Sequence, residues 1–289
     1  DGDWVELTRR GAKFYDNDNN EVSRYSQKTQ ASAFLVDKGN HRHFMAKEIH
    51  EQPEVVGRTL SHYIDMAEGR VRLPFDVPFD LKALKKISIS ACGTAYLAGL
   101  TAKYWIERFA RIQVDIDIAS EFRYRELPLD EGELTIVVSQ SGETADTLAS
   151  LRYARSQGQK ILSVVNVPTS TIARDSDVVA LTLAGPEIGV ASTKAFTCQL
   201  SVLAALAVAL ASARGTITAE QERGLVNELI HIPGLVAEAL KCEAHVEHLA
   251  RELSKAKDVL YLGRGTSYPL AMEGALKLKE ISYIHAEGY

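Results

Sequence analysis

A short apolar run that ends in a hydroxyl-rich turn constrains this chain more than any other stretch. Residues 134–138 read Leu-Thr-Ile-Val-Val and carry no charge, and three of them are Val or Ile. This pattern is typical of a strand that is buried on both faces of a sheet. The turn Ser139-Gln140-Ser141-Gly142 follows, and apolar residues recur at helical spacing from Glu143 onward. The sequence therefore predicts a strand, a turn and a helix in direct succession.

The turn is well supplied with donors for an anion such as phosphate. The first N–H groups of a helix have no partner within the helix and carry partial positive charge, so a helix start attracts anions. Gln140 adds an amide, and Gly142 permits a tight turn. Hydroxyl groups come from Ser139, Ser141, Thr144 and Thr147. No Lys lies in the turn, which excludes a P-loop. On spacing alone, an ordinary Ser N-cap without a ligand remains the alternative.

Composition narrows the class of protein. The 289 residues are 46% hydrophobic, enough for about two domains. The net charge of −5 argues against nucleic acid as the main partner. The three cysteines, Cys92, Cys198 and Cys242, are too sparse for a disulfide framework and lack metal-ligand spacing, which favours the reducing cytoplasm.

Two sequence features could suggest a membrane span or a metal site, and we assign neither. The apolar stretch Leu200–Ala213 is shorter than the roughly 20 residues that a membrane span needs, so it predicts a buried core helix and no membrane partner. His41, His43 and His50 lie within ten residues of one another, but His43 and His50 are about two helical turns apart. We therefore assign no metal to these histidines.

The middle of the chain alternates strands and helices. Strands are predicted at 86–94, 114–118, 134–138, 160–167 and 178–183, with helices between them. This alternation predicts an α/β fold with a parallel sheet covered by helices on both faces, a Rossmann-like three-layer arrangement. Ligands bind such sheets outside the carboxyl ends of the strands. Cys92-Gly93-Thr94 and Ser139-Gln140-Ser141 both follow strands, so one pocket can use both.

The segments on either side of this alternation have their own predicted structure. Residues 1–25 suggest a two-stranded hairpin with an Asn/Asp turn, residues 26–45 a linker, and residues 53–68 a helix. Later helices are expected at 219–242 and 244–257, with Pro233 interrupting the first. Before the apolar helix, Ser192 is a natural N-cap, and Lys194 is expected in solvent rather than on a phosphate.

A second strand and Gly-Thr turn begins at Asp258. Gly265-Thr266 repeats the pattern of Gly93-Thr94, which suggests a second copy of the α/β unit that needs residues beyond Tyr289 to complete a sheet. A helix is predicted over 272–287. Its Glu273, Lys277 and Glu280 share one face, and the charge pattern alone favours a solvated ion-pair face.

The nine residues Ser139–Thr147 resemble the sugar-phosphate loop of SIS (sugar isomerase) domains. Together with Glu273–Tyr283, they most closely resemble the isomerase half of the glucosamine-6-phosphate synthase family, also called glutamine–fructose-6-phosphate aminotransferases. The resemblance implies a complete first SIS domain and a partial second one. It divides the chain into the end of a glutaminase domain with a linker (1–45), the first SIS domain (46–215), and connecting helices with the start of the second (216–289).

The resemblance also implies roles for individual residues. Ser139, Gln140, Ser141 and Thr144 would hold the phosphate. The sugar would contact Thr94, the backbone around Cys92 and Gly93, and Val190, Ala191 and Ser192. Glu280 would be the base that moves a proton between C1 and C2 of the open-chain sugar, and Lys277 would orient it or stabilise negative charge.

The implied reaction makes glucosamine 6-phosphate from fructose 6-phosphate and glutamine-derived ammonia, in a cytoplasmic homodimer, with no metal or organic cofactor. The nucleophilic cysteine of the glutaminase domain is absent, so no glutamine hydrolysis is assigned. The ring-opening His and the Schiff-base Lys of the family are expected beyond Tyr289. Two alternatives stay open. One is a non-catalytic SIS module that senses sugar phosphates, and the other is a ketose isomerase without amination.

Overall fold

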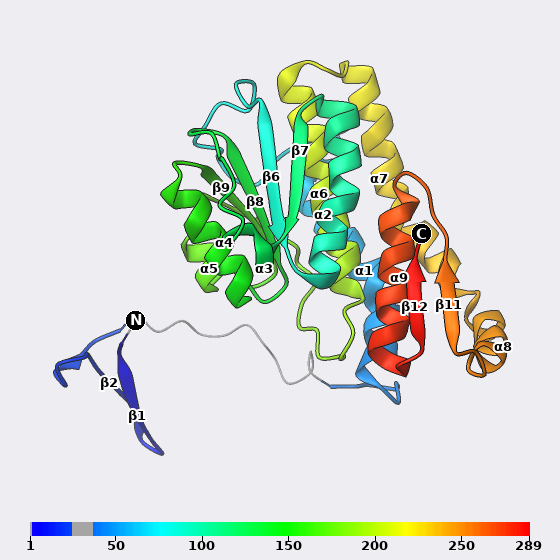
Figure 1. Ribbon diagram of the computed structural model, residues 1–289, viewed down its shortest axis with the longest axis horizontal. Helices are drawn as coiled ribbons and strands as arrows, with labels where there is room; N and C mark the ends of the chain where they lie inside the picture. Colours follow the sequence, from blue (N-terminus) through cyan, green and yellow to red (C-terminus); the bar gives the residue numbers. More distant parts are fainter. Residues whose placement is uncertain (1, 25–36) are drawn as a thin grey trace. The chain divides into compact units, whose positions relative to one another are not determined.

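The computed structural model describes residues 2–24 and 37–289 (Figure 1). Contacts divide the chain into two compact units, Asp1–Asp37 and Lys38–Tyr289. Most of the predicted linker, residues 25–36, lies outside the described residues.

The first unit is a three-stranded antiparallel sheet, not the predicted two-stranded hairpin. Its strands are β1 (Trp4–Thr8), β2 (Gly11–Tyr15) and β3 (Glu21–Val22). The prediction missed the tight turn between β1 and β2, where the Thr8 hydroxyl accepts a hydrogen bond from the Arg10 N–H at 3.2 Å. The expected Asn/Asp turn exists and joins β2 to β3, with the Asp16 carboxylate accepting from the Asn20 N–H at 2.9 Å.

A five-stranded parallel sheet forms the centre of the second unit, as predicted. Its strands are β6 (Lys86–Ala91), β7 (Gln113–Ile118), β8 (Leu134–Ser139), β9 (Lys160–Val165) and β10 (Val178–Leu181). The spatial order is β10-β9-β8-β6-β7, and every pair is parallel. All six residues of β8 are buried, as the uncharged run indicates. The strand order reverses between β6 and β8, the position where sheets of this kind bind ligands.

Helices cover both faces of this sheet, which gives the predicted three layers (Figure 1). One face carries α2 (Gly93–Trp105), which continues into the π-helical turn η2 (Ile106–Ala110), and α6 (Lys194–Arg214). The other face carries α3 (Ala119–Phe122), α4 (Ala145–Ser156) and α5 (Thr171–Arg174). Among the described residues, α6 alone is long and apolar enough to span a membrane, but most of it is buried in the core. The prediction of a core helix is therefore confirmed.

Two helices differ from the prediction because each continues through a proline that was expected to begin or interrupt it. Helix α1 (Phe44–Tyr63) begins nine residues before the predicted start and contains Pro53. Helix α7 (Ala219–Leu240) passes through Pro233, which was expected to interrupt it. The Pro233 ring lies where α7 packs on Gly57 of α1, and a Cβ added at Gly57 would be 3.5 Å from Pro233 Cγ, an ordinary van der Waals contact. Packing between the two helices thus offsets the backbone hydrogen bond that proline removes. Helix α8 (Glu243–Leu253) follows, and α1 leads into the short hairpin of β4 (Ile64–Asp65) and β5 (Arg70–Val71).

The chain ends in a strand, a helix and a second strand. Strand β11 (Asp258–Tyr261) and strand β12 (His285–Gly288) pair in parallel, and α9 (Ser267–Ser282) connects them. The predicted helix over 272–287 was wrong at its end, because Tyr283 adopts a left-handed conformation with φ 61° and the chain turns into β12. Helix α9 lies beside α2 (Figure 1), and this contact brings the end of the chain to the five-stranded sheet.

Candidate functional site

A polar cavity of 240 Å³ lies at the carboxyl ends of β6 and β8, where the strand order reverses. Seven of the residues predicted from the sequence line it. They are Cys92, Thr94, Ser139, Gln140, Ser141, Thr144 and Ser192. Parallel neighbours end at the same edge of a sheet, so the turns after β6 and β8 meet there although β7 separates them in the sequence.

Hydrogen bonds within the turn after β8 hold its hydroxyls in place. The Ser139 hydroxyl accepts from the Gly142 N–H at 3.1 Å and shares a hydrogen bond with the Thr144 hydroxyl at 2.9 Å. The Ser141 hydroxyl accepts from the Glu143 N–H at 3.1 Å. Helix α4 begins at Ala145, after an N-cap residue, Thr144, whose side chain makes no capping bond. The interpretation of this turn as an ordinary Ser cap is therefore wrong, and the N–H groups at the start of α4 stay available to an anion.

Gly142 is required by this geometry. Its φ is 66°, in the left-handed region, and a Cβ added there would lie 2.0 Å from the Ser170 hydroxyl oxygen. Any other residue would both strain the backbone and displace Ser170. The close approach of this turn to the start of α5 thus shapes the side of the cavity that the turn after β8 forms.

Three buried polar atoms on the cavity wall have no hydrogen-bond partner among the described residues. They are Gln140 Oε1, Thr147 Oγ1 and Gln199 Oε1. Buried polar groups are nearly always hydrogen-bonded, so these atoms indicate that the cavity is built to receive a polar ligand or water. Gln199 was missed as a site residue, and Thr147 was noted only as one of the hydroxyls near the turn. The sequence feature that could have indicated a role for Gln199 was its position as an amide residue at the edge of the most apolar stretch of the chain.

The turn after β6 is tied to α9 through Thr94. The Thr94 hydroxyl donates to Glu273 Oε1 at 3.0 Å and accepts from Lys277 Nζ at 2.8 Å. Lys277 Nζ also lies 3.3 Å from Glu273 and 2.7 Å from Glu280. The structure therefore brings Lys277 and Glu280, which were singled out on α9, to a residue that lines the cavity nearly two hundred positions earlier in the chain.

The two carboxylates of this cluster differ in environment. Glu273 is 6% exposed, and its Oε2 has no partner among the described residues. Burial raises the pKa of Glu273 above its ordinary value, although Lys277 and Thr94 act in the opposite direction. A solvated ion-pair face, which the charge pattern alone favours, does not describe Glu273. The Glu280 side chain is 38% exposed and reaches the cavity wall through Lys277.

Other predicted residues lie away from the cavity wall. Gly93 begins α2 with φ 53° but is not among the lining residues. Val190 is 93% exposed, and Ala191 is fully buried next to it. The predictions for Ser192 and Lys194 need correction. Helix α6 begins at Lys194, so Ser192 is not its N-cap, and Lys194 is buried in an ion pair with Glu51 at 2.7 Å.

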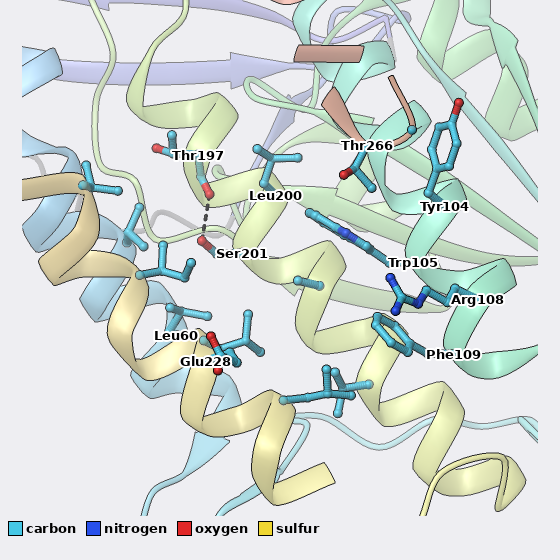
Figure 2. A pocket seen from close by; sticks show the side chains of 18 of the residues that line it. Leu60, Tyr104, Trp105, Arg108, Phe109, Thr197, Leu200, Ser201, Glu228 and Thr266 are labelled. Atoms are coloured by element: carbon cyan, nitrogen blue, oxygen red, sulfur yellow. Dashed lines mark hydrogen bonds between the residues drawn. The ribbon is translucent and has the colours of Figure 1, made fainter. Parts of the chain in front are cut away.

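A larger cavity, of 810 Å³, lies elsewhere and is lined mainly by apolar side chains; we call it the apolar cavity (Figure 2). Figure 2 shows Trp105, Phe109, Leu60 and Leu200 around it, contributed by α2, η2, α1 and α6. The second Gly-Thr turn, Gly265-Thr266, lines this cavity and not the polar one. The lining of the apolar cavity also includes Arg108 and Arg264, so the presence of donors does not separate the two cavities. We assign the candidate site to the smaller cavity because it lies at the strand ends where the strand order reverses and holds three buried polar atoms without a partner among the described residues. In the part of the chain that the structure describes, no group of three or more His, Cys, Asp or Glu is placed to hold a metal ion.

Comparison with known proteins places the chain in a family. The SIS domain model matches residues 80–209 and 252–289. A glutamine–fructose-6-phosphate aminotransferase (isomerizing) of Bradyrhizobium diazoefficiens is 65% identical over 289 residues, which are 100% of this chain and 48% of that protein. The enzyme of the same name from Brucella suis is 60% identical over 289 residues, 100% of this chain and 47% of its own length. The chain thus spans about half the length of the curated relatives it matches.

A solved structure gives the same assignment. The C-terminal domain of glucosamine-fructose-6-phosphate aminotransferase from Francisella tularensis is 45% identical, with a TM-score of 0.83, and the match covers 88% of this chain and 71% of that one. The predicted resemblance is confirmed. The chain therefore belongs to the SIS-domain family, in the group formed by the C-terminal halves of the glutamine–fructose-6-phosphate aminotransferases.

Proposed function

We propose that this chain is the sugar-phosphate isomerase segment of an enzyme that makes glucosamine 6-phosphate from fructose 6-phosphate and glutamine-derived ammonia. The observation that carries the proposal is the polar cavity between the ends of β6 and β8, whose Thr94 is bonded to Lys277 and Glu273 of α9. The names of the curated relatives support the substrate and the reaction.

The phosphate group would lie against the turn after β8. Ser139, Ser141 and Thr144 present hydroxyls there, Gln140 presents an amide, and the uncapped start of α4 adds backbone N–H groups. A phosphate ester carries several acceptor oxygens, and converging hydroxyl, amide and backbone donors satisfy them without a lysine. Thr147 and Gln199 add two more polar groups on the same wall.

The sugar would extend from the phosphate toward Thr94 and α9. Aldose–ketose exchange moves a proton between neighbouring carbons through an enediol or enamine, and one carboxylate can take the proton and return it. In this proposal Glu280 is that carboxylate. The Lys277 ammonium, 2.7 Å from Glu280 and 2.8 Å from the Thr94 hydroxyl, orients the base and stabilises negative charge that develops on the sugar oxygens. Ser192, on the cavity wall, would contact the sugar from the loop before α6.

The family assignment also supports a proposal about the location and assembly of the protein. We propose a cytoplasmic homodimer in which glutaminase activity comes from outside this chain. The free state of Cys92, Cys198 and Cys242 fits a reducing compartment. Burial raises the pKa of the Cys198 thiol to about 11, which keeps it protonated and chemically inert in the core.

Calorimetric titration of this chain with glucosamine 6-phosphate tests the proposal, with free glucosamine as the control ligand. We expect binding of the phosphate ester and none of the free sugar, because most of the donors lie on the phosphate side. Equal binding of both, or of neither by a chain that circular dichroism shows to be folded, would contradict the proposed site. A non-catalytic sugar-phosphate sensor would bind in the same way, so the role of Glu280 separates the two functions and is tested below.

A further inference from the structure

A buried carboxylate of α1 holds the loop that leads to Ser192. Glu48 is 2% exposed. Its Oε1 accepts from the Ile188 N–H at 2.6 Å and the Gly189 N–H at 3.1 Å, and its Oε2 accepts from the Gly189 N–H at 3.1 Å. A buried carboxylate needs such donors to offset its lost hydration, and backbone N–H groups that point at a charge form strong hydrogen bonds.

The loop backbone at Gly189 packs directly against α1. A Cβ added at Gly189 would lie 2.5 Å from Glu48 Oε2 and 3.3 Å from Met45 Cα. Gly189 is therefore required for the loop backbone to reach the carboxylate. Its φ is not positive, so the requirement comes from space and not from backbone conformation.

A second carboxylate connects the segment that Glu48 holds to Ser192 on the cavity wall. Glu187, one residue before the segment that Glu48 holds, accepts from the Ser192 hydroxyl at 2.9 Å and from the Thr193 and Ala195 N–H groups at 2.9 and 3.1 Å. At the far end of the loop, the Lys194 side chain is 5% exposed and pairs with Glu51, one turn after Glu48 on α1. Helix α1 thus holds both ends of the loop 187–194, and Ser192 lies between them.

The two sides of the cavity are consequently supported in different ways. The turn after β8 is held by hydrogen bonds among its own residues and by the start of α5. The loop with Ser192 is held from outside, by α1. We propose that Glu48 is a positioning residue for the sugar side of the site, which sets the affinity for the sugar portion of the ligand and leaves the phosphate side unaffected. The inference rests on the proposed function, since it takes a sugar phosphate as the ligand of this cavity.

Two substitutions of Glu48 distinguish a role in positioning the loop from a role in the stability of the whole chain. Glu48→Gln keeps a carbonyl-type oxygen that accepts from Ile188 and Gly189, whereas Glu48→Ala removes both acceptors. Hydrogen bonds to a charged group are worth enough that losing two of them should weaken glucosamine 6-phosphate binding by about tenfold or more. We expect Glu48→Ala to show this loss with inorganic phosphate affinity within about twofold of the unsubstituted chain, and Glu48→Gln to retain most of the sugar-phosphate affinity.

Gly189→Ala tests the same contact from the loop side and replaces Glu48→Ala if that variant does not fold. Its methyl group pushes the loop off Glu48 while the carboxylate stays, so we expect the same selective loss. Glu54→Gln, a change to an exposed residue further along α1, is the matched control and should bind as the unsubstituted chain does.

Hydrogen–deuterium exchange provides a readout that needs no ligand. The Ile188 and Gly189 amides should be protected in the unsubstituted chain and exchange faster in Glu48→Ala. Unchanged exchange there, equal loss of phosphate and sugar-phosphate binding, or a Glu48→Gln variant as weak as Glu48→Ala would overturn the positioning role. Failure of the unsubstituted chain to bind glucosamine 6-phosphate would instead overturn the proposed function, and the exchange data would still decide whether Glu48 holds the loop.

Discussion

The two Gly-Thr turns of this chain share a backbone design and differ in chemistry. Gly93 and Gly265 both follow a parallel strand, both have φ near the left-handed value, at 53° and 57°, and both lead into a helix. Thr94 lines the polar cavity and bonds to two charged side chains. Thr266 lines the apolar cavity and is exposed. A local motif therefore determines how the chain turns, and the neighbouring elements determine what the turn can bind.

Helix α9 connects the two turns. It begins just after the second turn, and its Lys277 and Glu273 contact the first. The second strand-helix-strand unit thus contributes charged groups to the site of the first. Four predictions test whether the first turn and α9 form the site together while the second turn takes no part in it.

The largest expected effect is on catalysis by Glu280. In the full-length aminotransferase that the proposed function implies, Glu280→Gln should lower isomerisation by about 10²- to 10⁴-fold, the usual contribution of a general base. Glucosamine 6-phosphate affinity should stay within a few-fold, because Glu280 does not line the phosphate side. The matched control is Glu252→Gln on α8, which breaks an exposed pair with Lys255 at the same i,i+3 spacing. Unchanged turnover in Glu280→Gln would favour the non-catalytic sensor.

Gly142→Ala comes next and compares two left-handed glycines. At Gly142 the new methyl group meets Ser170, so strain and overpacking should together cost about 3 kcal/mol of unfolding free energy and disrupt glucosamine 6-phosphate binding. Gly265→Ala has open space at its Cβ and should cost only about 1 kcal/mol. Urea unfolding of both variants measures the difference. Equal losses would mean that the close approach to Ser170 has no energetic role.

Thr94→Val and Thr266→Val compare the two turns directly. Removing the Thr94 hydroxyl takes one of two partners from the buried Glu273 Oε1 and leaves it only Lys277, which should cost about 1 kcal/mol of stability and weaken sugar-phosphate binding. The same change at the exposed Thr266 should stay within about 0.5 kcal/mol and leave binding unaltered. Thermal unfolding and calorimetry give both values. A comparable effect at Thr266 would show that the two turns are not distinguished by their neighbours.

The smallest effect concerns the pH dependence of stability. Burial raises the pKa of Glu273 in the folded chain above the ordinary value of 4.5, so at intermediate pH the folded state binds more protons than the unfolded state. The contribution of Glu273 to stability therefore falls as pH rises through this window. Glu273→Gln mimics the protonated form and should gain stability relative to the unsubstituted chain as pH rises above the ordinary pKa of 4.5. Glu238→Gln, at an exposed ion pair on α7, should show no such trend.

The fold was largely predictable because its strands are encoded locally. The alternating Ile and Ser residues at 86–91, the β-branched run at 134–138, and the Gly- or Ser-containing turns after them needed no knowledge of distant residues. The site was predictable to the extent that it consists of strand ends. Ser139 and Thr94 follow strands that the pattern identifies, and parallel packing brings such ends together.

The partners of charged side chains were not predictable, because packing between distant segments decides them. Lys194 was expected in solvent, yet it is buried on Glu51 of α1. Glu48 sits in a helix of ordinary charge pattern, and nothing in that pattern indicates that it accepts from N–H groups 140 residues later. Likewise, the break expected at Pro233 is absent because α1 packs against α7 at that point.

The all-parallel order of the central sheet also affects how the chain assembles. Parallel neighbours cannot be joined by a tight turn, so each strand pairing closes a long loop. Strand β6 pairs with β8 although the whole of β7 lies between them in the sequence. Such pairings form slowly, because loop-closure entropy is lost before the contacts stabilise the sheet. The cavity walls come from the start of α2, the end of β8 with its turn, and α6 together, so a ligand recognises only the nearly complete structure. Under the proposed function, sugar phosphates are such ligands and should slow unfolding of this chain while leaving its folding rate almost unchanged.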